Sequence, residues 1–167
     1  ADEDITVTIS TSGTGTEGTD YGTISDITIS AGATTGTASF TPTDDSVYEG
    51  NETGIVAISG VSGADAAESG SQSVTITITE NESSPTVTLA TSGTSIAENS
   101  GSTLTLTATI SQAADEDVTV NLGAAGTSTN GTDYGSLSSI TVSAGATTGT
   151  ATFDPTDDSV YEGNETA

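Results

Sequence analysis

Apolar and polar residues alternate with a period of two along most of the chain, and no other feature of the sequence constrains the fold as strongly. Because successive side chains of a strand point to opposite faces, each run predicts a half-buried strand with Thr or Ser facing water. The runs are Ile5–Ile9, Ile27–Ile29, Ala38–Phe40, Val56–Ile58, Val74–Ile78, Val87–Leu89, Leu104–Ile110, Val118–Leu122, Ile140–Val142 and Ala151–Phe153. No helical periodicity of useful length accompanies them. The pattern predicts an all-β protein, an antiparallel sandwich of about seven short strands per repeat.

The sequence repeats itself after 113 residues. The pentapeptide GTDYG stands at 18–22 and again at 131–135, and the tetrapeptide at 1–4 returns at 114–117 without a gap. A unit of this length is a whole domain rather than one coil of a solenoid. The 167 residues therefore hold one repeat and the first part of another.

A domain boundary is predicted at the polar segment Asn81–Pro85, which ends in proline as linkers often do. On this interpretation residues 1–84 are the C-terminal part of one repeat, and residues 85–167 are the N-terminal part of the next. Each part would lack strands of its sandwich, so we expect the chain alone to fold poorly as a monomer. One alternative is that the strands at 53–79 complete the sandwich begun at 86–167, within one chain or between chains.

The charge of the chain is entirely negative. It carries 24 acidic residues and no Lys, Arg or His, giving a formal net charge of −24. Self-repulsion on this scale opposes compaction and is typical of disorder, but the regular alternation favours a folded chain. Counterions, hydrogen bonds or bound metal must then offset the repulsion. We expect no binding to nucleic acid or anionic lipid, and no apolar run of about 18 residues predicts membrane insertion.

The residue types needed for most enzymatic chemistry are missing. Without His, Cys or Lys the chain has none of the usual bases and activated nucleophiles. A carboxylate pair could serve a glycosidase, but sugar clefts use aromatic platforms and Trp is absent. We therefore predict that the protein is not an enzyme.

An acidic block follows one predicted strand in each repeat. The segments 41–53 and 154–166, TPTDDSVYEGNET and DPTDDSVYEGNET, differ in one letter of thirteen. Ca²⁺ takes six to eight oxygen ligands and tolerates irregular geometry, so carboxylates clustered on a loop suit it. Acids on loops more commonly just face water, but the repetition of this block beside a strand end favours a calcium site.

Five segments together resemble successive signatures of the Calx-beta domain. They are SIAENSGSTLTLTATIS (95–111), GTDYG, ITVSAGATTGTATF (140–153), DDSVYEGNET and VTITITENE (74–82). That family includes regulatory domains of sodium–calcium exchangers, cytoplasmic repeats of an integrin subunit and tandem arrays in bacterial surface proteins. The resemblance covers essentially the whole chain in permuted halves. It implies an immunoglobulin-like sandwich of seven strands with Ca²⁺ ions clustered at one end, near the domain junction.

The resemblance also implies a set of ligands. By position they are Glu98, Asp20, Asp133, Asp44, Asp45, Asp157 and Asp158, and more loosely Asp65, Glu68 and Glu80. The exchanger domains carry three consecutive Asp at the central segment, where this chain has Ser46 or Ser159 in third place. This departure predicts fewer ions or weaker binding. Glu49 and Glu52 are expected to be solvated or to cap the turn.

The preferred functional interpretation is a structural or adhesive repeat segment of a long secreted or cell-surface protein, an adhesin or matrix fibre stiffened by Ca²⁺. Near-copies in tandem suit a spacer, whereas a calcium sensor, the first alternative, uses one or two diverged domains. The second alternative is a subunit of a self-assembling extracellular filament, completed by strand exchange through open sheet edges. The expected partners are neighbouring repeats of the same or identical chains, including a homopolymer.

Overall fold

The computed structural model describes residues 1–167, which divide into two compact units. Unit 1 comprises residues 1–45 and 49–81, and unit 2 comprises residues 46–48 and 82–167. Strands of both units pair antiparallel, and the one helical element is a short 3-10 turn, η1 (Glu98–Ser100). The all-β, antiparallel fold class predicted from the alternation is confirmed.

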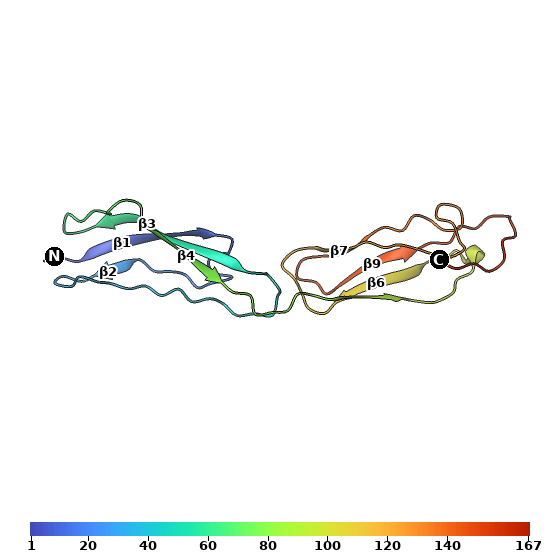
Figure 1. The fold of residues 1–167 in the computed structure, drawn as a ribbon, viewed down its shortest axis with the longest axis horizontal. Helices are drawn as coiled ribbons and strands as arrows, with labels where there is room; N and C mark the ends of the chain where they lie inside the picture. Colours follow the sequence, from blue (N-terminus) through green and yellow to red (C-terminus); the bar gives the residue numbers. More distant parts are fainter. The chain divides into compact units, whose positions relative to one another are not determined.

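Unit 1 is a four-stranded sheet in the order β2-β1-β3-β4 (Figure 1). Its strands are β1 (Ile5–Gly13), β2 (Ile27–Ile29), β3 (Glu52–Ser62) and β4 (Ser73–Ile78). The two long strands β1 and β3 form the middle of the sheet, with Val7 opposite Val61. Most apolar side chains of these strands are only half-buried, so unit 1 has a thin core.

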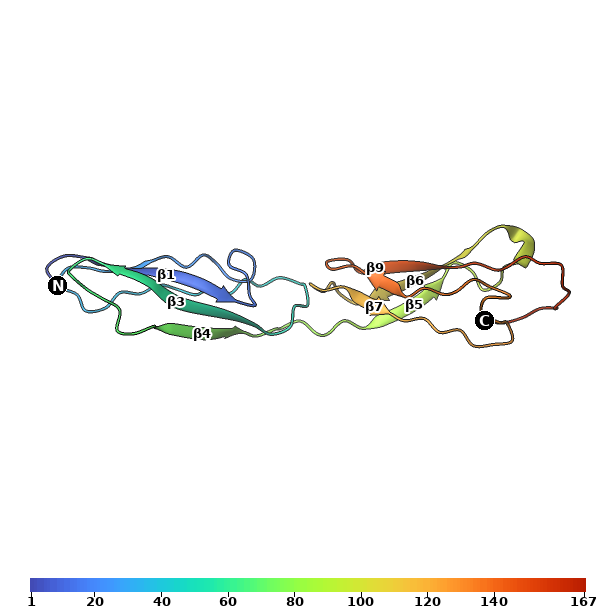
Figure 2. The same cartoon turned by 90° about the horizontal axis from the view of Figure 1, so that it is seen from above.

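Unit 2 has two sheets, and buried apolar side chains from both of them form its core. One sheet has the order β5-β6-β9, from β5 (Val87–Thr91), β6 (Leu104–Ile110) and β9 (Thr148–Phe153). The other pairs β7 (Val118–Val120) with β8 (Ile140–Val142), and Figure 2 shows these layers from above. Four buried residues from β6 and β8 form the centre of the core: Ala108, Ile110, Ile140 and Val142.

The 113-residue period allows the same sequence to be compared in both units. β2 and β8 are repeat equivalents and pair in the same register, Ile5 with Ile29 and Val118 with Val142. The residues equivalent to β9, 35–40, form no strand in unit 1. The strand predicted at Ala38–Phe40 is therefore wrong. β9 is a strand because it pairs with β6, and unit 1 holds no counterpart of β6 among its described residues.

The strands at 53–79 do not complete the sandwich begun at 86–167. β3 pairs with β1 and β4, and neither β3 nor β4 pairs with a strand of unit 2. The sequence alternative of closure within one chain is thus not the arrangement the structure adopts. Each unit instead builds its sheets from strands on its own side of residue 82.

The difference in burial between the two units predicts that the same Ile→Ala substitution lowers the free energy of unfolding more in unit 2 than in unit 1. Ile140→Ala should destabilise unit 2 by about 2–5 kcal/mol, because Ile140 is fully buried in a packed core. Ile27→Ala, its repeat equivalent on half-buried β2, should cost clearly less. Denaturant unfolding in saturating Ca²⁺ measures both values. Equal costs would contradict the assignment of the main core to unit 2.

Candidate metal centre

The GTDYG segment folds into the same tight loop in both units. In unit 1 the Thr16 N–H donates to Asp20 Oδ2 (2.5 Å), and the Asp20 N–H donates back to the Thr16 carbonyl (2.9 Å). Thr129 and Asp133 form the same two hydrogen bonds in unit 2, at 2.5 and 2.9 Å. Asx-type pairing of this kind is a local property of the sequence. It sets the direction of each Asp carboxylate.

A tyrosine next to each Asp anchors the loop. Tyr21 is 1% exposed and stacks on Phe40 with ring centroids 4.6 Å apart. Tyr134, also buried, stacks on Phe153 at 4.9 Å. Such stacked pairs add about 0.5–1.5 kcal/mol beyond burial of their area. Asp20, whose residue is 9% exposed, is therefore held beside the most buried side chain of unit 1.

Two glutamates of the EGNE segment converge on this Asp in each unit. In unit 1 the carboxylate oxygens of Asp20, Glu49 and Glu52 lie within 4.8 Å of one another. In unit 2 the repeat-equivalent residues Asp133, Glu162 and Glu165 do the same. We call these the Asp20 cluster and the Asp133 cluster. The same arrangement occurring at both repeat positions shows that it follows from the repeated sequence.

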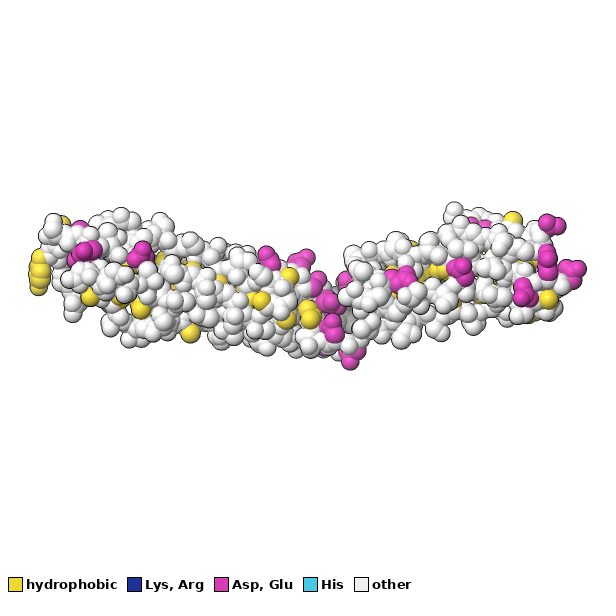
Figure 3. All heavy atoms as spheres, turned by 180° about the vertical axis from the view of Figure 1, so that it is seen from behind, with side chains coloured by type: hydrophobic (Ala, Val, Ile, Leu, Met, Phe, Trp, Pro, Cys, Tyr) yellow, Lys and Arg dark blue, Asp and Glu magenta, His cyan; other side chains and the backbone are white.

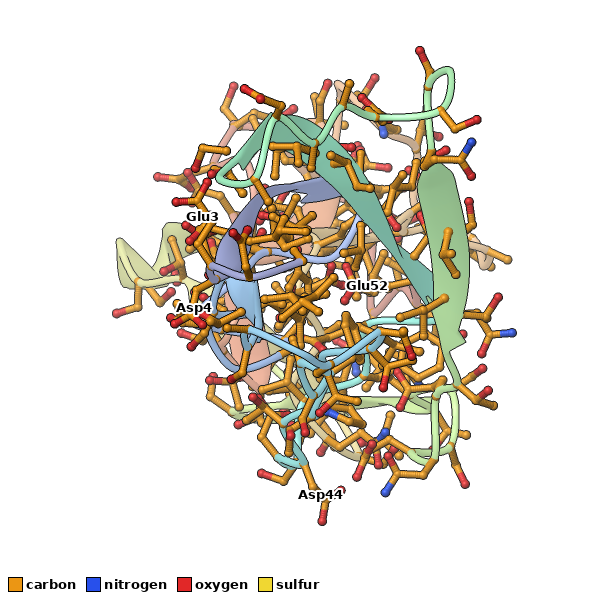
Figure 4. All side chains as sticks on the ribbon, turned by 90° about the vertical axis from the view of Figure 1, so that its left-hand side faces the viewer. Glu3, Asp4, Asp44 and Glu52 are labelled. Atoms are coloured by element: carbon orange, nitrogen blue, oxygen red, sulfur yellow. The ribbon has the colours of Figure 1, made fainter.

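Glu52 is half-buried in unit 1, and one of its carboxylate oxygens is cut off from solvent. It is the first residue of β3, and its Oε2 atom is buried. Figure 4 shows it in the interior of the unit, whereas Asp44 projects at the outer edge. The expectation that Glu52 is solvated is therefore wrong. A buried carboxylate oxygen next to two further carboxylates is costly unless a cation or proton joins them.

Glu80 fixes the loop that carries Glu49. Its Oε2 accepts hydrogen bonds from the backbone N–H groups of Glu49 (2.6 Å) and Gly50 (2.7 Å). The Glu80 N–H in turn donates to Asn51 Oδ1 (2.9 Å). Glu80 was predicted as a metal ligand, and the structure gives it this positioning contact beside the Asp20 cluster.

The acids of unit 2 form one electrostatic group around the Asp133 cluster. Partial loss of hydration raises the pKa of Glu162, and repulsion by Asp133, Asp158, Glu165 and Glu98 raises this pKa further. The pKa of Glu165 is also raised by loss of hydration, then by repulsion from Asp133, a hydrogen bond with the Asp133 side chain and repulsion from Glu98. Five carboxylates thus repel one another, and the chain has no basic side chain to neutralise them.

Some of the ligands predicted from the sequence come together and others do not. Asp20 and Asp133 belong to the two clusters, and the charges of Glu98 and Asp158 act on the second. The side chains of Asp44, Asp45 and Asp157 are exposed. Asp44 Oδ1 accepts a hydrogen bond from Asn81 Nδ2 (3.0 Å).

Asp65 and Glu68 lie beyond the end of β3 that is opposite to Glu52. Asp65 has a positive φ of 51° in the turn after β3, and Glu68 Oε1 accepts a hydrogen bond from the Gln72 N–H (2.6 Å). Because the whole of β3 separates them from Glu52, these two acids cannot share an ion with Asp20 within unit 1.

The sequence analysis expected Glu49 and Glu52 to be solvated or to cap the turn, and it did not name Glu162 or Glu165. The structure brings all four glutamates into the two clusters. The signal was present, since both pairs stand three residues apart in the identical EGNE segment. The spacing did not reveal that β3 begins at Glu52. Because it is the first residue of this strand, Glu52 is held in the sheet next to Asp20.

The donor set fits a hard divalent cation. Ca²⁺ binds carboxylate oxygens at about 2.3–2.6 Å, so two ligand oxygens of one ion lie up to about 5 Å apart. The oxygens of each cluster, within 4.8 Å of one another, satisfy this limit. Figure 3 shows acidic side chains in groups on the surface and no basic side chain near them. The residues present therefore fit a calcium ion in each unit.

One charge-removing substitution tests the Asp20 cluster against a matched control. Asp20→Asn keeps an oxygen that can accept the Thr16 N–H but removes ligand charge. Ca²⁺ at a hundredfold excess over Kd stabilises a domain by about 2.7 kcal/mol, and tenfold weaker binding lowers this to about 1.4 kcal/mol. Calorimetry in Ca²⁺ and in chelator measures the difference. Asp65→Asn, the control, should leave the stabilisation by Ca²⁺ unchanged. An equal loss of this stabilisation in both variants would mean that Ca²⁺ only screens charge and does not bind at a site.

The raised pKa values of Glu162 and Glu165 predict a pH dependence with a definite sign. Because folding favours their protonated forms, unit 2 in chelator should gain stability as pH falls through these values and lose it as pH rises. Protons also compete with Ca²⁺, so the gap between melting temperatures in Ca²⁺ and in chelator should narrow at low pH. Glu162→Gln with Glu165→Gln should flatten the chelator curve. An unchanged slope in that double variant would contradict the assignment.

Comparison with known proteins identifies the family of the chain. The Calx-beta domain profile matches residues 1–82 and again residues 80–166, which together cover nearly the whole chain. No curated protein matches the sequence. None of its helices is long and apolar enough to cross a membrane. The chain belongs to the Calx-beta family of calcium-binding β-sandwich domains.

Proposed function

We propose that this chain is a structural segment of a long secreted or cell-surface protein, stiffened by Ca²⁺ bound to the Asp20 and Asp133 clusters. One observation carries the proposal. The same three carboxylates are brought together in both units, by the same hydrogen bonds and the same tyrosine–phenylalanine stacking. Each repeat thus builds its own cation site, as an array of equal elements requires.

The stiffening follows from what the clusters connect. Asp20 lies on the GTDYG loop, Glu49 on the acidic loop and Glu52 at the start of β3. Without a cation their charges push these segments apart, and the effect is large where an oxygen is buried. A bound Ca²⁺ replaces this repulsion with a link between two loops and a strand. The metal would therefore convert a flexible end of each unit into a rigid one.

Near-identity of the repeats favours a spacer over a sensor. The acidic blocks of the two repeats differ at one position in thirteen, and a sensor module gains nothing from faithful copies. Catalysis is not expected, because Calx-beta is a non-catalytic family and the chain has no His, Cys or Lys. An adhesive or matrix role at the cell surface uses the array as a stalk.

Electron–electron distance measurements test the stiffening directly. The chain has no cysteine, so Thr28→Cys and Thr141→Cys introduce one spin label on β2 and one on its repeat equivalent β8. The distance distribution should be narrow in Ca²⁺ and broad in chelator. Distributions equally broad in both conditions would overturn the stalk proposal. Two narrow distributions with different means would favour a sensor.

A filament completed by strand exchange is the second candidate. It is favoured by exposed apolar side chains on edge strands of both units. Leu89 on edge strand β5 is 56% exposed, and Val74 on edge strand β4 is 63% exposed. An extended segment of another chain would pair with such an edge strand, and main-chain pairing of this kind gives affinity without charge.

A further inference from the structure

The loop that carries Asp133 contains a dipeptide with its own chemistry. Asn130–Gly131 stands where the first repeat has Glu17–Gly18. The main-chain nitrogen after an asparagine can attack the side-chain amide carbon and close a five-membered ring, and glycine has no side chain to hinder this attack. The other asparagines precede Glu, Ser or Leu and are Asn51, Asn81, Asn99, Asn121 and Asn164. The most reactive amide predicted in the chain is therefore that of Asn130.

The closed loop withholds the attacking nitrogen. The Gly131 N–H donates to the Tyr134 carbonyl (2.8 Å), and Asn130 and Tyr134 form a β-bridge. In unit 1 the Gly18 N–H donates to the Tyr21 carbonyl in the same way (2.7 Å). The bond is thus a property of the loop and is present with either set of neighbouring strands. To act as a nucleophile, the Gly131 nitrogen must leave this hydrogen bond and lose its proton to solvent.

The side-chain amide of Asn130 is held much less firmly. Its Oδ1 atom accepts a hydrogen bond from Ser136 Oγ at 3.5 Å, which is too long to fix the side chain in one rotamer. The carbon to be attacked can therefore turn toward the main chain. The hydrogen bond of the Gly131 nitrogen is the restraint that keeps the two groups from reacting.

We propose that Asn130–Gly131 is a site of spontaneous deamidation, a covalent modification that opening of the GTDYG loop permits. The deprotonated Gly131 nitrogen forms a bond to Asn130 Cγ, and the bond from Cγ to the amide nitrogen breaks. Ammonia leaves with that electron pair and takes a proton from water. Water then opens the cyclic imide at one of its two carbonyls, giving aspartate or isoaspartate. One water is consumed and one ammonia released, with no oxidation or reduction.

The isoaspartate product alters the loop that orients Asp133. Its main chain runs through the former side chain, which adds one methylene group between Thr129 and Asp133. The hydrogen bonds from the Thr129 N–H to Asp133 Oδ2 (2.5 Å) and from the Gly131 N–H to the Tyr134 carbonyl fit the original spacing. Unit 1 is protected by its sequence, because Glu17 has no amide group to lose. Modification would therefore damage the Asp133 cluster and spare the Asp20 cluster.

The effect of Ca²⁺ on this reaction rests on the proposed function, whereas the site and its control by the loop do not. If an ion held by Asp133 must leave before the loop opens, Ca²⁺ at a hundredfold excess over Kd lowers the open population about a hundredfold. The rate of deamidation would fall by the same factor. A comparison of native and denatured chain in chelator tests control by the loop without any cation.

The experiment follows deamidation in the full chain at mildly alkaline pH. Samples in chelator, in Ca²⁺ and in chelator with denaturant are digested at intervals, and mass spectrometry locates the gain in mass from amide to carboxyl. Asn130 should react before any other asparagine. In chelator the native chain should react about tenfold or more slowly than the denatured chain, because opening a folded loop costs free energy. Ca²⁺ should slow the native reaction further.

Two variants provide the matched controls. Glu17→Asn places the same dipeptide in the equivalent loop of unit 1, and this position should then react with the same protection in the native chain. Asn130→Gln should not react, because its longer side chain would have to close a less favourable six-membered ring. After long incubation this variant should keep its stabilisation by Ca²⁺, while the unmodified sequence loses part of it.

The proposal is overturned if another asparagine reacts first, or if Asn130 reacts as fast in the native chain as in denaturant. A native chain that is protected in chelator but gains nothing from Ca²⁺ would support the site and its control by the loop. That result would instead contradict the assignment of a cation to the Asp133 cluster.

Discussion

Repulsion between carboxylates that no basic side chain can neutralise is the constraint on which this structure depends. The fold meets it first with backbone N–H groups, which serve as donors where other proteins use Lys or Arg. Asp4 and Asp26 accept backbone N–H groups from residues distant in the sequence, at 2.7 and 3.0 Å, and Glu68 accepts the N–H of nearby Gln72 at 2.6 Å. Hydrogen bonds to a charged acceptor are stronger than neutral ones. These carboxylates thus hold loops and turns in place by accepting backbone hydrogen bonds.

The second response is to concentrate the remaining charge where an external cation can reach it. The strands of both units are rich in Thr, and their cores are small, with fully buried large side chains only at Tyr21, Ile140 and Val142. A small core contributes limited burial energy. Stability therefore has to come from the ends of the units, where a loop, a strand and three carboxylates meet. In each unit the three carboxylates lie close enough together to share one hard cation.

The sequence predicted the strand faces well, because alternation is a local property, but it did not predict pairing. Residues 35–40 have the same pattern as β9, and only the presence of β6 as a partner distinguishes the two. In the candidate site, too, the features set by local sequence were predictable and those set by strand pairing were not. Asp20 and Asp133 were implied by the family resemblance, and the GTDYG segment that carries them forms the same local loop in both units. Glu52 was not predicted, because its burial depends on where β3 starts.

Glu80 gives the linker a mechanical role. It is the residue before Asn81, at which unit 1 ends, and its carboxylate holds the Glu49 and Gly50 backbone. Tension transmitted along the main chain past Asn81 loads β4 lengthwise against β3 and pulls on the Glu80 hydrogen bonds at the same time. The acidic loop is therefore the first element to feel a load. If the chain is a spacer under tension, as proposed above, a cation that ties this loop to Asp20 and β3 would have to be released before the loop could extend. The calcium concentration around the protein would then set the load that each repeat resists.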